Sequence, residues 1–188
     1  MGGDLGRLTW EGGHTMEPFD AATLILRLVL GVVMLAHGVK HAKGREKTSK
    51  WFASIGFKAP GMQWFASTAT EIGVGVLLIA GAGTSLAAAG LIGIMTVAFV
   101  SVHRPVGFWI TARPDEGYEY VMTLAAAAVA LAILGPGTAS VDNVLELDVL
   151  LDGWVGLAVG LAGGAVALVQ LALFFRPVKE AAKEAGNL

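Results

Sequence analysis

Two charged residues interrupt apolar runs that are otherwise long enough to cross a bilayer. Arg27 lies within the run 21–39, and Glu71 lies within the run 63–80. A charge at the centre of a membrane costs about 2.5–3.5 kcal/mol, so such a residue is expected to have a partner or a function. We expect Arg27 and Glu71 to form an ion pair between the first two helices. The pair could hold these helices in register, or its members could bind a ligand or transfer protons.

Two histidines and a second carboxylate are predicted to lie near one end of the same helices. His37 is close to the end of the first apolar run, His103 follows the third, and Glu119 opens the fourth. With Glu71 they come from four helices and share one half of the membrane, where histidines and carboxylates are typical of proton paths and polar ligand sites. The candidate site is therefore Arg27, His37, Glu71, His103 and Glu119. The alternative is that His37, His103 and Glu119 occupy wet headgroup positions without a special role.

Metal and haem chemistry find less support in these residues. His37 and His41 have the i, i+4 spacing that can chelate an ion, but Lys40 nearby disfavours a cation and no further ligand is evident. A haem between His37 and His103 is geometrically feasible, but a b-type cytochrome with several haems would need more intramembrane histidines. We therefore predict no metal site and do not expect haem. The chain has no cysteine, which excludes disulfides and thiol chemistry by this chain.

The elements that must position these residues are apolar helices. The chain has 188 residues, of which 55% are hydrophobic and 15% charged, with a mean hydropathy of +0.67. Soluble domains have about 25% charged residues, and a spanning helix needs about 20 mostly apolar residues. The segments that meet this need are 21–39, 63–80, 83–102, 120–134 and 153–175. The sequence predicts an all-α, polytopic transmembrane bundle.

Lysine and arginine are distributed unevenly between the two sides of such a bundle. With five spans, eleven of the 13 fall on one side: Lys40, Lys43, Arg45, Lys47, Lys50, Lys58, Arg104, Arg113, Arg176, Lys179 and Lys183. The opposite side keeps only Arg7, and Arg27 lies within a helix. Cytoplasmic loops carry such an excess. We therefore predict an N-terminus outside and a C-terminus in the cytoplasm.

The connecting segments complete the predicted organisation. The predicted parts are an outer segment 1–20, a four-helix domain 21–142, an outer loop with a fifth helix 143–175, and a cytoplasmic tail 176–188. Part of the first segment could precede the true start at Met16. Residues 45–58 are predicted to form an interfacial helix, the alternative being a solvated loop. The glycine spacings of the last helix favour close packing, either within the chain or in a homodimer.

The order and spacing of several short motifs resemble those of the DoxX family of small bacterial membrane proteins. The motifs are Arg27-Leu28-Val29-Leu30-Gly31, His37-Gly38, Gly56-Phe57-Lys58-Ala59-Pro60, Glu71-Ile72-Gly73, His103 with Gly107-Phe108, Gly117-Tyr118-Glu119-Tyr120, Gly135-Pro136-Gly137 and Ser140-Val141-Asp142. The resemblance implies a four-helix bundle in a bacterial plasma membrane, to which the fifth helix is an addition. It also implies a link to thiosulfate–quinone oxidoreductase subunits and to membrane redox complexes.

Two main functions remain open at this point, and transport of a small lipid or solute is a third option. In the first, the chain is a subunit of a quinone-linked redox complex, with the candidate residues around the quinone headgroup and electrons supplied by a protein partner. In the second, it is a non-catalytic scaffold whose basic loop 40–58 binds anionic lipid or an acidic partner, and whose last helix docks another subunit. Membrane lipids are expected as partners in both cases, and nucleic acid in neither. The sequence does not decide whether the chain is an enzyme.

Overall fold

The computed structural model describes residues 8–9, 15–111, 116–147 and 152–178. Its helices are α1 (Pro18–Lys43), α2 (Arg45–Ser54), α3 (Pro60–Ala80), α4 (Thr84–Ala98), the π-helix η1 (Phe99–His103), α5 (Glu119–Leu134), α6 (Val141–Val144) and α8 (Gly153–Phe174). A two-residue antiparallel pair, β1 (Leu8–Thr9) with β2 (Thr15–Met16), precedes α1. The predicted helical bundle is confirmed. The predicted tail beyond Val178 and most of residues 1–14 lie outside the described residues.

Four of these helices are long and apolar enough to cross a membrane: α1, α3, α4 continued by η1, and α8. The fifth, α5, is apolar but has only 16 residues. Its length is about 24 Å at 1.5 Å per residue, against a hydrocarbon core of about 30 Å. The chain is a multi-pass membrane protein, and each predicted apolar segment corresponds to one of these helices.

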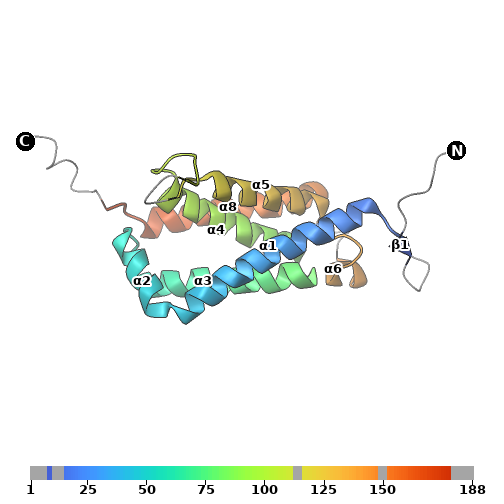
Figure 1. Cartoon of the computed structure of the whole chain (residues 1–188), viewed down its shortest axis with the longest axis horizontal. Helices are drawn as coiled ribbons and strands as arrows, with labels where there is room; N and C mark the ends of the chain where they lie inside the picture. The colour runs from blue at the N-terminus through green and yellow to red at the C-terminus, as the bar shows by residue number, and fades with distance from the viewer. Residues whose placement is uncertain (1–7, 10–14, 112–115, 148–151, 179–188) are drawn as a thin grey trace, which may run out of the picture.

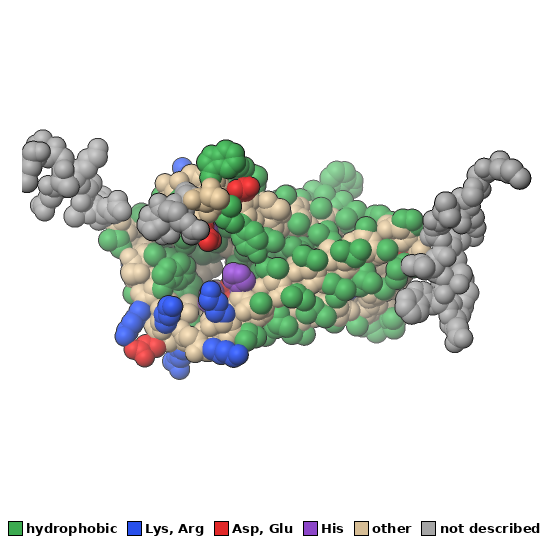
Figure 2. Space-filling model, in the orientation of Figure 1, with side chains coloured by type: hydrophobic (Ala, Val, Ile, Leu, Met, Phe, Trp, Pro, Cys, Tyr) green, Lys and Arg blue, Asp and Glu red, His purple; other side chains and the backbone are tan. Residues whose placement is uncertain are grey.

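The spanning helices pack around α4, which contacts α3, α5 and α8, while α1 packs mainly against α3 (Figure 1). The core between them consists of fully buried side chains such as Leu30, Leu78, Leu91 and Leu131. The outer faces are also apolar, as Figure 2 shows for one side of the molecule. Apolar surface on the outside of a bundle is the property that a lipid environment requires.

The glycines of α8 serve packing within the chain. A Cβ atom on Gly163 would collide with the backbone carbonyl of Ala89 in α4, and one on Gly160 would lie 3.0 Å from Ile92. Small residues let membrane helices approach closely enough for their backbones to touch. Of the two uses predicted for these glycines, the structure therefore shows the intrachain one for Gly160 and Gly163.

The two ends of the bundle differ in charge. Lysine and arginine side chains gather around α2, at what we call the basic end (Figure 2). The predicted interfacial segment is helical there over Arg45–Ser54, with Phe52 buried and Trp51 42% exposed. The opposite end, called the far end, holds α6 and the start of α1 (Figure 1).

Candidate functional site

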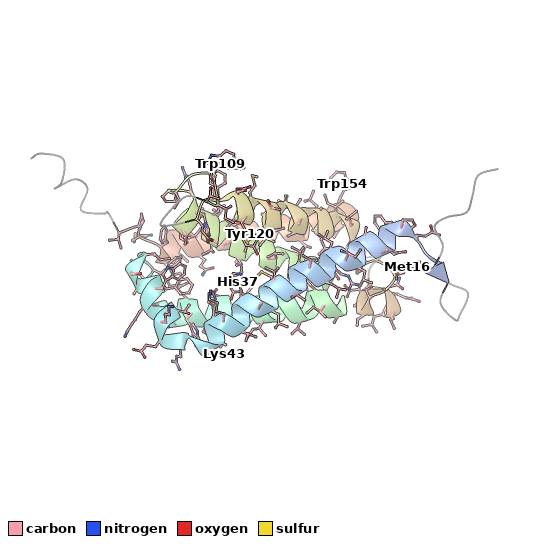
Figure 3. The ribbon with its side chains drawn as sticks, viewed as in Figure 1. Met16, His37, Lys43, Trp109, Tyr120 and Trp154 are labelled. Atoms are coloured by element: carbon pink, nitrogen blue, oxygen red, sulfur yellow. The ribbon has the colours of Figure 1, made fainter. Side chains whose placement is uncertain are left out.

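A cavity of about 500 Å³ lies between α1, α3, α4 with η1, α5 and α8, and it reaches α2 through Trp51 and Phe52. Most of its wall is apolar, with side chains such as Val97 and Val166. Its polar groups include His37, His41, Gln63, Glu71, His103, Glu116 and Gln170. Figure 2 shows the molecule hollowed beside a histidine, and His37 is labelled at the corresponding place in Figure 3.

One polar contact in the cavity wall joins α1 to α3. His41 Nδ1 lies 2.8 Å from Glu71 Oε2, and the Glu71 side chain is only 5% exposed. The hydroxyl of Ser67 donates to Glu71 Oε1 at 3.3 Å. A histidine beside a buried carboxylate is an arrangement that can accept and release protons.

The packing of α1 on α3 explains this contact. A Cβ atom on Gly38 would lie 2.8 Å from the backbone nitrogen of Ile72 and 3.0 Å from the Cβ of Glu71. The helices can approach this closely only because Gly38 has no side chain. The backbone of His41 is also fixed, since Trp64 Nε1 donates to its carbonyl oxygen at 2.9 Å. Both members of the pair therefore have defined positions.

The predicted ion pair between Arg27 and Glu71 is wrong. Arg27 lies against Gly81 at the end of α3, ten residues beyond Glu71, which is about 15 Å along the helix. Helical side chains project toward the N-terminus of their own helix. The Arg27 side chain therefore extends toward the far end, away from Glu71, which lies midway along α3.

Arg27 instead holds the loop that follows α5. Its side chain is fully buried, and its Nη2 donates to the carbonyl oxygen of Ala139. The carboxylate of Asp142 attracts its guanidinium. The same carboxylate accepts hydrogen bonds from the backbone nitrogens of Gly83 at 2.6 Å and Thr84 at 2.8 Å, where α4 begins. Arg27 is thus a structural residue of the far end and lies outside the cavity lining.

His103 and Glu119 have different surroundings although the sequence grouped them. His103 closes η1 and lines the cavity, and its Nδ1 lies 2.7 Å from the carbonyl oxygen of Glu116. Because a carbonyl only accepts, Nδ1 carries the proton and Nε2 is the acceptor of the neutral ring. Glu119 accepts from the backbone nitrogen of Ile110 at 3.2 Å and is not part of the cavity lining. It shapes the loop before α5.

Three of the five candidate residues, His37, Glu71 and His103, thus line one cavity, and Arg27 and Glu119 do not. Sequence reasoning missed His41, Gln63, Glu116 and Gln170 as members of the site. His41 is one turn from His37 on α1, and Gln170 is the only strongly polar residue of α8, so a signal existed for both. Among the described residues, no group of three or more His, Cys, Asp or Glu could hold a metal ion.

The model of the DoxX family matches residues 22–104. One relative is the protein named "Putative oxidoreductase CatD" of Bacillus subtilis (strain 168), which is 28% identical over 117 residues, covering 61% of this chain and 81% of the relative. No solved structure matches the chain. The resemblance read from the motifs is confirmed over the matched segment, which contains His37, His41, Gln63, Glu71 and His103 but not Gln170.

Proposed function

We propose, from the DoxX match and the cavity together, that the chain is a small membrane subunit of a quinone-linked redox complex. The proposal rests on one observation, the contact between His41 and Glu71 in the wall of a largely apolar cavity of about 500 Å³. Ligand sites typically have about 300–1,000 Å³ and combine apolar walls with a few placed polar groups. A quinone has the matching character, since a ring with two carbonyl oxygens carries an apolar tail. The printed name of the Bacillus subtilis relative supports a redox role.

The proposed role of the cavity residues is to bind the ring and to move protons. Reduction of a quinone to a quinol adds two electrons and two protons, and each carbonyl becomes a hydroxyl. The two electrons come from a partner redox protein with its own cofactor. Protons reach the ring oxygen through His41 and Glu71, which are in contact and of residue types that exchange protons. His37, which is exposed and lines the same cavity, connects this pair to the surface.

Replacing Glu71 with glutamine tests this proposal. The change keeps the size of the side chain but removes the charge that holds the imidazole of His41, 2.8 Å away. Because this contact positions the imidazole proposed to bind the ring, we expect the amount of bound quinone to fall about tenfold, which corresponds to about 1.4 kcal/mol. The measurement is quinone extracted per mole of protein purified in mild detergent.

The matched control is Glu46→Gln, the same chemical change on an exposed side chain of α2 that pairs with Lys50. This variant should keep the wild-type quinone content. A wild-type protein that never carries quinone and co-purifies with protein partners would instead favour the scaffold function. The observation that favours this second function is the exposed basic surface of α2, formed by Arg45, Lys47 and Lys50.

The orientation in the membrane is a further part of the proposal. The basic end faces the cytoplasm of a bacterial cell, because short loops rich in lysine and arginine are retained there. We expect a reporter fused after Leu188 to be active in the cytoplasm and a reporter within 135–152 to be active outside. The same reporters showing the reverse activities would overturn the orientation, and with it the proposed cytoplasmic access to the cavity.

A further inference from the structure

A second polar contact lies in the cavity wall, away from His41 and Glu71. It joins Gln63 of α3 to Gln170 of α8, whose Nε2 donates to Gln63 Oε1 at 2.7 Å. Both residues line the cavity. Gln63 is only 2% exposed, and Gln170 stands in a helix that has no charged residue. A polar group placed among apolar helices is costly unless its hydrogen bonds are made.

The two amides have more hydrogen-bonding capacity than their mutual contact uses. Each carries two N–H donors and a carbonyl acceptor, and the single contact uses one donor and one acceptor. The amide nitrogen of Gln63 is buried and has no hydrogen-bond partner among the described residues. Buried donors of this kind are normally paired. The missing partner therefore points to a ligand in the cavity.

The spacing along α3 indicates what that ligand looks like. Gln63, Ser67 and Glu71 occupy positions i, i+4 and i+8 and all line the cavity. Gln63 and Glu71 are about 12 Å apart along the helix axis. A hydrogen bond of about 2.9 Å at each end leaves about 6 Å between two polar atoms of the ligand. This is close to the distance between two oxygens on opposite carbons of one six-membered ring.

We propose that Gln63 and Gln170 bind the second ring oxygen of the ligand, opposite the oxygen that meets His41 and Glu71. This inference rests on the proposed quinone function and names the residues that bind the second oxygen in the same cavity. An amide donates to a carbonyl and accepts from a hydroxyl, so the pair binds the ring in both the quinone and the quinol form. Gln170 lies outside the segment that matches DoxX, so α8 adds a ligand contact that the matched segment lacks.

The end of α8 is held so that Gln170 stays beside Gln63. The backbone nitrogen of Lys58 donates to the carbonyl of Phe174 at 2.8 Å, and that of Arg176 donates to the carbonyl of Gly56 at 2.9 Å. The rings of Phe57 and Phe175 are 4.9 Å apart. These contacts tie α8, one turn beyond Gln170, to the loop that precedes Gln63. The amide pair is therefore positioned before any ligand binds.

The test compares two soluble probes on the full chain in detergent, a short-tailed 1,4-benzoquinone and the matching phenol, which has one ring oxygen. Gln170→Leu removes the amide at similar side-chain volume. It should lower the affinity for the quinone about fivefold, the effect expected from the loss of one neutral hydrogen bond. The phenol, whose oxygen meets His41 and Glu71, should keep its affinity. Val169→Leu, at a 59% exposed neighbouring position, is the control and should bind both probes as the wild type does.

The possible results separate this inference from the proposed function. A wild type that binds neither probe overturns the proposed function and the inference together. A wild type that binds quinone while Gln170→Leu binds it equally well overturns the inference alone. If Gln170→Leu loses affinity for the quinone and the phenol equally, the inference is also overturned, because that result indicates a changed cavity shape. Gln170→Met, which is similar in length and has no amide, replaces Gln170→Leu if the leucine variant does not fold.

Discussion

Arg27→Ala is expected to lower the free energy of unfolding by about 3–5 kcal/mol, the range typical when a buried charge is left without its opposite charge. The guanidinium is fully buried, donates to the carbonyl of Ala139 and attracts Asp142. Without it, the 5% exposed carboxylate of Asp142 loses its counter-charge. The loop after α5 and the start of α4 both depend on that carboxylate. Denaturant-induced unfolding in mixed micelles measures the loss.

A double-mutant cycle identifies the partner of Arg27. The variant with both Arg27→Ala and Asp142→Ala should lose less stability than the sum of the single changes, because the second change removes a charge that the first left unpaired. Arg27→Ala combined with Glu71→Gln should be additive, since Arg27 lies against Gly81, which is about 15 Å along α3 from Glu71. Additivity for Arg27 with Asp142, or strong coupling of Arg27 to Glu71, would contradict the structure.

The spanning helices could be predicted because each needs a long apolar run, and the sequence displays such runs directly. The end of α1 shows where this reasoning fails. The apolar run ends at Val39, but the helix continues to Lys43. Lys40, His41 and Lys43 lie in its last turn, where cations interact favourably with the helix dipole. The i, i+4 spacing places His41 one turn after His37, but a hydropathy criterion ends the apolar run before His41 and gives no direction for its side chain toward Glu71.

The candidate site was predicted in part. Counting residues along a helix gives the depth of each residue in the membrane, but not the direction in which its side chain points. Depth alone placed His37, Glu71 and His103 in one half of the membrane, and these three do line one cavity. It could not show that the Arg27 side chain extends toward the far end. The pairing of Gln63 with Gln170 depends on where α8 packs, and residues 107 positions apart in the sequence give no local signal of their contact.

The packing of α8 makes two adjacent glycines respond differently to the same substitution. A Cβ atom on Gly163 would collide with the backbone carbonyl of Ala89, whereas one on Gly164 would lie 3.4 Å from Ile92 and 3.6 Å from Thr96, which are ordinary contacts. A backbone carbonyl within a helix cannot move aside as a flexible side chain can. Gly163→Ala should therefore push α8 away from α4.

We expect Gly163→Ala to cost about 1–3 kcal/mol, the usual range for overpacking a well-packed contact. Gly164→Ala should be neutral or stabilising by up to about 1 kcal/mol, because alanine favours a helix over glycine. Thermal unfolding of both variants in the same detergent gives the comparison. The position of α8 also sets the distance from Gln170 to Gln63, so Gly163→Ala should lower quinone affinity while Gly164→Ala leaves it unchanged. Equal stability of the two variants would mean that α8 packs on α4 through a different face.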